Sequence, residues 1–246
     1  MISFIVPTLP DEPYLKHTLN SILEEIDRNP LENMEVIVVG KDNESRNLAK
    51  LMEQLSSPYI RYFDIDGNRS EARNFGIRMA RNNFLTFVDA DTIIGRNFIP
   101  ITLDDFRSNY AYILYSTLPL EQSYLGFIGT KFIDVNAYLI QMIRKHRFPG
   151  YCCSLRKDIL EKVKVGNEYF LKRMAGHGED SELASRYGKF CRSYGLRGRF
   201  ERRVKVYTSV RELKRAGVGK ALARLAVDTT LGVVWKRPVL RNWREL

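Results

Sequence analysis

The sequence predicts an α/β fold in which a mixed, mainly parallel sheet is flanked by helices. Up to residue 91, short runs of β-branched and aromatic residues alternate with segments whose apolar residues recur at helical spacing. One helical segment separates each strand from the next, which is the connection that parallel strands need. Polar turns follow these strands, and ligands bind beyond the carboxyl ends of strands in such sheets.

The amino-terminal half shows this alternation most clearly. Leu15, Leu19, Ile22 and Ile26 fall on one face of a helix. Asn68 or Ser70 is available to cap the third helix at its amino end. We expect strands at 2–6, 34–39, 60–64 and 83–88, and helices at 14–27, 45–55 and 70–80.

The carboxyl-terminal half is less regular. The segment 124–143 is rich in aromatic and aliphatic residues but contains Lys131 and Asp134, which indicates an amphipathic or buried helix. No linker clearly divides the chain, so we expect one domain at 1–210 followed by a basic helical extension at 211–246. Further strands are expected at 110–117, 148–155 and 204–208, and further helices at 176–194 and 217–235.

Positive charge is concentrated near the carboxyl end of the chain. The 246 residues carry a net charge of +10, and residues 186–246 hold 17 Lys and Arg against 4 Asp and Glu. This segment indicates an anionic partner (nucleic acid, a membrane surface or a phosphorylated substrate) or else a solvated basic face. Nucleic acid is not expected, because Phe200 and Tyr207 do not form a base-stacking module among the cations.

The cysteines and the amino terminus favour a cytoplasmic protein. The chain has three cysteines, Cys152, Cys153 and Cys191, whose odd number and spacing fit neither a disulfide framework nor a CxxC metal site. We therefore expect these cysteines to be small buried residues. The start of the chain lacks the basic region of a signal peptide and reaches Pro7 early. The sequence contains no run of about 18 uncharged apolar residues, so a membrane-spanning helix is not expected.

Two acids, Asp89 and Asp91, stand one residue apart at the carboxyl end of the fourth predicted strand. Such a pair is costly unless something cationic lies between its members. A divalent cation that carries a diphosphate is the obvious candidate, and hard oxygen ligands favour Mn²⁺ or Mg²⁺ over zinc. For this short pattern alone, a polar turn remains the alternative.

Five short motifs in register resemble those of the family 2 glycosyltransferases of the GT-A fold, which transfer a sugar from a nucleotide diphosphate sugar. The motifs are SFIVPT at 3–8, EVIVV with KDN at 35–43, SEARNFG at 70–76, FVDAD at 87–91 and GED at 178–180. The resemblance implies a nucleotide-sugar-binding half at 1–95 and an acceptor half at 96–210.

The resemblance also implies roles in the donor site. Asp91 would bind the divalent cation directly, and Asp89 would reach the ribose or a metal-bound water. Asp42 would bind the base, although Gly40 and Lys41 stand where many relatives carry an acid. Further contacts with the nucleotide sugar are implied for Pro7, Thr8, Arg73 and Arg211. A structural salt bridge is the alternative for Arg73, and a solvated basic helix for Arg211.

An inverting transfer needs a carboxylate that removes the proton of the acceptor hydroxyl. The resemblance implies that Asp180 is this base and that Glu179 orients the acceptor, with the reverse assignment as the alternative. Acids in the first turn of a helix are also favoured without any catalytic role. His177 is a further candidate for a metal ligand or a diphosphate contact, or else a simple loop residue, and 150–152 would line the acceptor side.

These expectations together describe a metal-dependent, inverting glycosyltransferase. Its donor would be a UDP- or GDP-sugar, and its acceptor a saccharide hydroxyl or a lipid-linked phosphate. The helix at 217–235, with Trp235 and Trp243 beside basic residues, either contacts an anionic membrane surface or packs on the domain. Three rival functions remain: a nucleotidyltransferase, a nucleic-acid-binding protein and an inactive nucleotide-sugar-binding homologue. The nucleotidyltransferase is disfavoured because no Gly-rich, Lys-containing loop follows the first strand.

Overall fold

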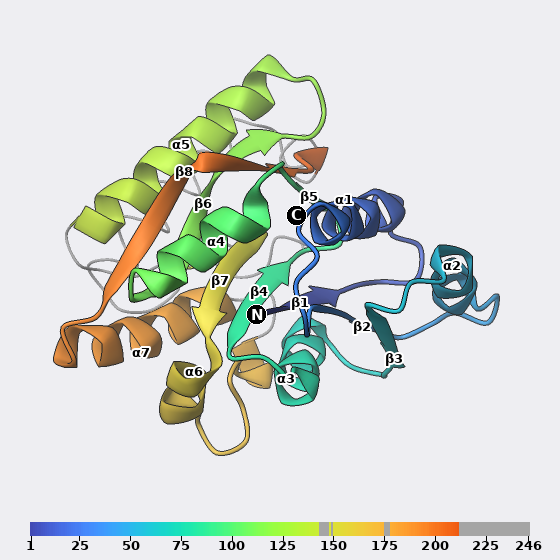
Figure 1. Cartoon of the computed structure of the whole chain (residues 1–246), viewed down its shortest axis with the longest axis horizontal. Helices are drawn as coiled ribbons and strands as arrows, with labels where there is room; N and C mark the ends of the chain where they lie inside the picture. The colour runs from blue at the N-terminus through green and yellow to red at the C-terminus, as the bar shows by residue number, and fades with distance from the viewer. Residues whose placement is uncertain (143–147, 149, 175–177, 212–246) are drawn as a thin grey trace.

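The computed structural model describes residues 1–142, 148, 150–174 and 178–211, which form one mixed sheet with helices on both faces (Figure 1). The strands are β1 (Ile2–Pro7), β2 (Glu35–Gly40), β3 (Ile60–Asp64), β4 (Phe84–Val88), β5 (Thr92–Ile94), β6 (Tyr110–Pro119), β7 (Cys152–Arg156) and β8 (Arg197–Thr208). The helices are α1 (Leu15–Arg28), α2 (Asn47–Leu55), α3 (Arg69–Met79), α4 (Phe98–Arg107), α5 (Tyr124–Met142), α6 (Lys157–Val163), α7 (Glu179–Ser193) and the short 3-10 helix η1 (Lys172–Met174).

The sheet has a parallel part and a mixed part. Its strand order is β3-β2-β1-β4-β7-β6-β8-β5. The first four strands in this order are parallel to one another, and β7 joins β4 and β6 in antiparallel pairing. The next pair, β6 and β8, is again parallel, while β5 closes the edge antiparallel to β8.

Each face of the sheet has its own core, because alternate residues of a strand point to opposite faces. Phe4 of β1 packs on the face covered by α1, α2 and α4, where its ring centroid lies 6.2 Å from that of Phe98. Ile5 packs on the face covered by α3, α6 and α7. There, a Cβ on Gly76 would lie 2.5 Å from the Ile5 side chain, so α3 approaches the sheet closely only with glycine at this position.

The predicted α/β class is confirmed, and so is the strand–helix alternation up to β4. In the second half, β5, α4, α6 and η1 were not predicted. The three residues of β5 are too few to show a period, and α4 begins after Asn97 in the left-handed region, with Pro100 in its first turn. The full length of β8 was not predicted, because the strand begins with an arginine-rich stretch. Register shifts also interrupt the pairing of β8 with β6.

The predicted extension lies outside the described residues beyond Arg211, so its helix at 217–235 stays a prediction. The division at 210 stays one as well. Among the described residues, none of the helices combines the length and apolar character that crossing a membrane requires.

Candidate active site

The candidate site is organised around one buried arginine, Arg73 of α3. A capping box between Asn68 and Glu71 begins this helix, and Arg73 lies just beyond its first turn. From Nη1 the guanidinium donates to Oδ1 of Asp180 at 2.7 Å, and from Nη2 to Oδ1 of Asp89 at 3.0 Å. The Arg73 side chain is 1% exposed. It therefore joins the end of β4 to the start of α7, two segments far apart in the sequence.

Three more contacts hold the Arg73 guanidinium. Nη2 also donates to the carbonyl oxygen of Gly150 at 2.7 Å, and Nη1 lies 3.7 Å from a carboxylate oxygen of Glu179. The guanidinium carbon lies 5.1 Å from the centroid of the Phe170 ring. Burial opposes the charged form, but the surrounding carboxylates outweigh it and raise the pKa of Arg73. The structural salt bridge is thus present, and a contact of Arg73 with a nucleotide stays a prediction.

Asp89 and Asp91 lie directly beyond β4, where the sequence places them. The backbone N–H of Asp89 donates to the carbonyl of Tyr151 at 2.9 Å, and that of Thr92 donates to the carbonyl of Asp89 at 3.0 Å. Burial, followed by the charges of Asp89 and Glu12, raises the pKa of Asp91 to about 6. A carboxylate in these surroundings is one whose charged form a cation would stabilise.

Arg211 reaches this acid from the carboxyl end of the described chain. Its Nη2 lies 3.4 Å from Oδ2 of Asp91 and also contacts the carboxylate of Glu12. Glu121 positions the segment before it, because its carboxylate accepts the hydroxyl of Ser209 at 2.5 Å and the N–H of Val210 at 2.8 Å. A basic side chain therefore does approach the predicted metal-binding acid.

Asp180 and Glu179 open α7 after Gly178, whose φ of 94° turns the chain into the helix. The Asp180 side chain is 21% exposed, whereas that of Glu179 is 5% exposed. Burial raises the pKa of Asp180 to about 6, since Arg73 offsets it only in part and Glu179 adds to it. A carboxylate with this pKa is still ionised at neutral pH and is a stronger base than an ordinary aspartate. Of the two acids, Asp180 is the one that a substrate can reach.

The ends of β1 and β2 meet beside Thr8. Its N–H donates to the carbonyl of Val39 at 2.9 Å. A Cβ on Gly40 would lie 2.3 Å from the carbonyl oxygen of Thr8, so the two strand ends can approach only because residue 40 is glycine. The turns that follow β1 and β2 therefore lie side by side, directly after Pro7.

Asp42 has a structural task that was not predicted from the sequence. Its carboxylate accepts the backbone N–H groups of Asn43, Leu48 and Ala49, which satisfies the amino end of α2. Burial opposes the charged form of Asp42, but the three N–H groups outweigh burial and lower the pKa of this carboxyl. They use three of about four acceptor positions on the carboxylate. Binding of a base by Asp42 stays a prediction.

The family model described as "Glycosyl transferase family 2" matches residues 3–164, about two thirds of the chain. The matched stretch includes Arg73, Asp89 and Asp91. The chain belongs to glycosyl transferase family 2.

Two curated relatives are bacterial proteins of greater length. The minor teichoic acid biosynthesis protein GgaB of Bacillus subtilis is 24% identical over 208 residues, which cover 79% of this chain and 22% of GgaB. The uncharacterized glycosyltransferase EpsJ of the same organism is 30% identical over 96 residues, which cover 38% of this chain and 27% of EpsJ. This family 2 chain spans about a quarter of the length of these relatives.

Solved structures share the fold with this family 2 chain. TarS of S. aureus superposes with a TM-score of 0.62 at 16% identity, covering 98% of this chain and 40% of TarS. The mannosyltransferase PcManGT of Pyrobaculum calidifontis, in complex with GDP-Man and Mn²⁺, superposes with a TM-score of 0.62 at 16% identity, covering 92% of this chain and 64% of PcManGT. The predicted GT-A fold is confirmed.

The residues at the end of β4 fit a divalent cation by their chemistry. Mg²⁺ and ions like it are held by one or two carboxylates together with substrate phosphates. Burial and neighbouring acids raise the pKa of Asp91, so a cation here would stabilise its charged form, and Asp89 lies beside it. Among the described residues, no three His, Cys, Asp or Glu side chains gather as a ready metal site. His177 lies outside the described residues.

Two acids of the site, Glu12 and Glu121, were not predicted. Both lie in irregular segments, where neither a period nor a motif distinguishes them from surface acids. The stretch 150–152, expected on the acceptor side, does lie at the site: Arg73 binds Gly150, and Asp89 binds Tyr151. The expectation for the cysteines is also confirmed, since all three are buried and free.

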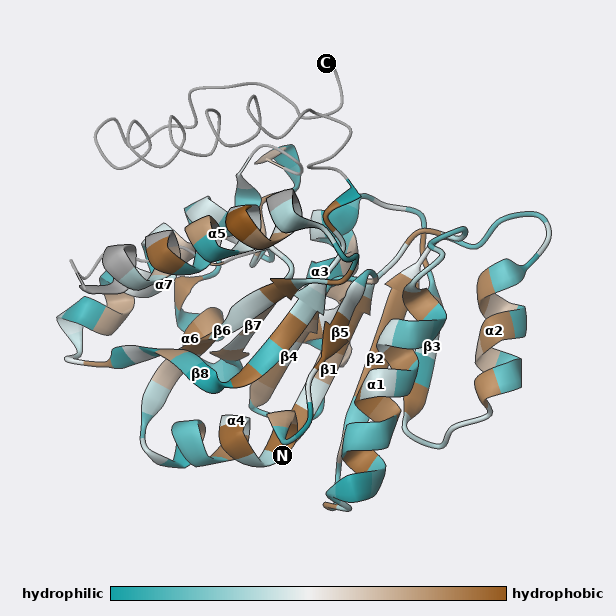
Figure 2. Ribbon diagram, turned by 90° about the horizontal axis from the view of Figure 1, so that it is seen from above, coloured by the Kyte–Doolittle hydropathy of each residue, from teal (hydrophilic) through white to brown (hydrophobic). Residues whose placement is uncertain are grey.

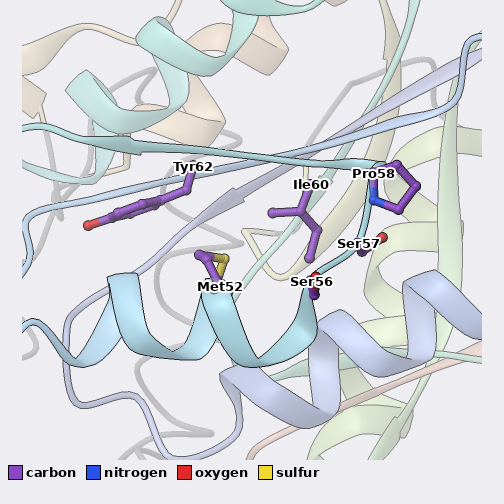
Figure 3. Close-up of a pocket in the computed structure, with 6 residues that line it drawn as sticks. All are labelled: Met52, Ser56, Ser57, Pro58, Ile60 and Tyr62. Atoms are coloured by element: carbon purple, nitrogen blue, oxygen red, sulfur yellow. The ribbon is translucent and has the colours of Figure 1, made fainter.

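A cavity of about 420 Å³ lies elsewhere, between α2 and β3 (Figure 3). Its lining consists of Met52, Ser56, Ser57, Pro58, Ile60 and Tyr62. None of the predicted site residues belongs to this lining, so the cavity is not part of the candidate site.

Proposed function

We propose that this chain transfers a sugar, with inversion, from a UDP- or GDP-sugar to an acceptor hydroxyl or lipid phosphate. The observation that carries the proposal is the bridge formed by Arg73 between Asp89 and Asp180. It brings an acid from the nucleotide-sugar half and the candidate base from the acceptor half into one site. The solved relatives TarS and PcManGT, in complexes with UDP-GlcNAc and with GDP-Man and Mn²⁺, support the choice of donor.

Asp180 would act as the general base. Because Arg73 holds its Oδ1, the other oxygen, Oδ2, is the one left to receive the proton of an acceptor hydroxyl. A divalent cation held by Asp91 and Asp89 would supply charge neutralisation for the departing nucleoside diphosphate. Arg211 lies where it would add positive charge on the same side.

One curated relative supports the choice of acceptor class. GgaB is named for the biosynthesis of minor teichoic acid, which supports a saccharide or lipid-linked acceptor in cell-surface polymer synthesis. We place this reaction in the cytoplasm, at the inner membrane face, where the excess of basic residues would meet anionic lipids.

The test compares three variants of the chain: Asp180→Asn, Asp91→Ala and the control Asp158→Asn. Asp158 is likewise an acid in the first turn of a helix, but it pairs with Arg156 outside the site. We expect Asp180→Asn to lower the transfer rate by about 10²–10⁴-fold with donor binding retained. Asp91→Ala should lose the thermal shift that UDP- or GDP-sugar with Mn²⁺ produces, and EDTA should abolish the shift in the unchanged chain.

Two outcomes would overturn the proposal. Full turnover by Asp180→Asn would remove the base assignment. Release of pyrophosphate from a nucleoside triphosphate, in place of a nucleoside diphosphate from a nucleotide sugar, would identify a nucleotidyltransferase.

A further inference from the structure

The helix α5 exposes apolar side chains and buries two polar ones, while the side chain of Lys131 is partly exposed. Thr130 and Asp134 are 1% and 7% exposed. Six aromatic or aliphatic residues of α5 are exposed by 38% to 80%: Tyr124, Phe127, Ile128, Phe132, Val135 and Tyr138. They recur every three or four residues, so they form one continuous stripe, which we call the α5 face.

Hydrogen bonds fix the rotation of this helix. The carboxylate of Asp134 accepts the hydroxyl of Ser116 at 2.7 Å and the backbone N–H of Thr117 at 2.9 Å, both on β6. Turning the α5 face inward would break these buried bonds, which are costly to lose. The outward direction of the apolar stripe is therefore built into the fold.

Two cations lie beside aromatic rings of the α5 face, and one of them, Lys131, also lies 3.5 Å from a carboxylate oxygen of Asp134. The ammonium of Lys131 lies 5.5 Å from the centroid of the Phe127 ring. The guanidinium of Arg202, on the neighbouring β8, lies 4.5 Å from the Tyr138 ring and 5.7 Å from that of Phe200. In Figure 2, α5 carries apolar turns between more polar ones, and Figure 1 shows β8 running alongside this helix. Aromatic rings with neighbouring Lys and Arg are typical of side chains that enter the headgroup region of a bilayer.

Charge decides among the occupants of this face. A second copy of the chain would bring the cations of its own β8 against those of the first. The chain's own segment 212–246 is also basic, with 8 Lys and Arg against 3 Asp and Glu. An anionic bilayer matches both the apolar side chains and the cations of this face, because it has an apolar interior and negative headgroups.

We propose that the α5 face docks this chain on an anionic lipid bilayer. The position of α5 gives this docking a consequence for the site. Glu121, just before α5, binds Ser209 and Val210, which precede Arg211 at Asp91. Docking would therefore bring lipid headgroups to the edge of the candidate site, where a lipid-linked acceptor could enter.

The experiment is co-sedimentation of the full chain with phosphatidylcholine vesicles that contain or lack phosphatidylglycerol. The variant is Val135→Glu, and its matched control is Val165→Glu, because Val165 is similarly exposed (50% against 56%) but lies outside α5. We expect the unchanged chain to bind only the anionic vesicles. Val135→Glu should lower the vesicle partition coefficient about tenfold or more, and Val165→Glu should leave it unchanged.

Three outcomes would overturn this proposal: no binding of the unchanged chain, equal binding to both kinds of vesicle, or equal partition of the two variants. A fall in melting temperature or a changed oligomeric state for Val135→Glu, without vesicle binding by the unchanged chain, would show that protein covers the face. Vesicle binding requires no turnover. A failure here is therefore distinct from a failure of the proposed sugar transfer.

Discussion

Two arginine–carboxylate clusters of this protein are built in opposite ways. At the candidate site, Arg73 is 1% exposed, while Asp89 and Asp180 are 18% and 21% exposed. At α4 and β8, Arg203 is 46% exposed and covers Asp105 and Glu201, which are 4% and 1% exposed. The first cluster presents Asp89 and Asp180 to solvent on a buried cation, and the second holds Asp105 and Glu201 beneath an exposed one.

This difference in exposure distinguishes a ligand-binding site from a cluster that only connects two elements of the fold. Acids that face solvent on a fixed cation are ready to meet a ligand, and their position is set before it arrives. Acids buried under an arginine can only connect the elements that carry them. Arg203 joins α4 to β8 in this way, through contacts with Asp104 and Asp105 on the helix and Glu201 on the strand.

The largest effect is expected for Arg73→Met. Removing the cation takes the buried guanidinium partner away from Asp89 and Asp180, which should lower the free energy of unfolding by about 3–5 kcal/mol. Transfer should also be lost, and Arg73→Lys should restore it only in part, because an ammonium cannot reproduce the fork of a guanidinium. Urea unfolding and turnover assays measure the two effects. Arg203→Met is the control, and we expect it to keep transfer; equal loss of transfer in both variants would contradict the distinction.

A smaller effect is expected for Gly150→Ala. The new Cβ would lie 2.7 Å from Oδ2 of Asp180, so the carboxylate has to move. A displacement of this kind should lower the turnover number about 10²-fold. Donor affinity should change little, because Asp91 is not displaced. Steady-state kinetics together with donor titration would check this, and an unchanged turnover number would show that the position of Asp180 is not critical.

The smallest effect concerns pH and the second cluster. Burial, helped by Glu201, raises the pKa of Asp105 to about 7. The folded state then holds a proton that the unfolded state releases near pH 4, so stability falls as the pH rises from about 4 to about 7. Asp91 and Asp180 act in the same direction only up to about pH 6. Urea midpoints of the unchanged chain should therefore still fall between pH 6 and pH 7.5, and those of Asp105→Asn should not. Parallel curves would contradict the raised pKa of Asp105.

The fold of the amino-terminal half was predictable because its signals are local. Period, capping residues and turn residues lie within a few positions of one another, as in the capping box of Asn68 and Glu71. The start of α7 at Glu179 was predictable for the same reason. In the second half, β8 escaped full prediction because its first residues are mainly arginines, whose pairing with β6 depends on a distant strand.

The sequence predicted several residues of the candidate site, but it did not predict the contacts that these residues make. Asp89, Asp91 and Asp180 were named from motifs, and the structure brings Asp89 and Asp180 together on Arg73. The same motifs did not reveal that Asp42 holds the amino end of α2. Which acid faces a ligand and which satisfies the backbone depends on the neighbours that folding supplies.

The sequence by itself determined the order of strands and helices up to β4, the placing of Asp89 and Asp91 at a strand end, and the placing of Asp180 in the first turn of a helix. Only the tertiary structure decided that Arg73 is buried between Asp89 and Asp180, and that α5 turns its apolar side outward. The physical reason is the range of the interactions. Periodicity and capping act over a few residues, whereas the pairing of charges 107 residues apart is set by the packing of the two faces of the sheet.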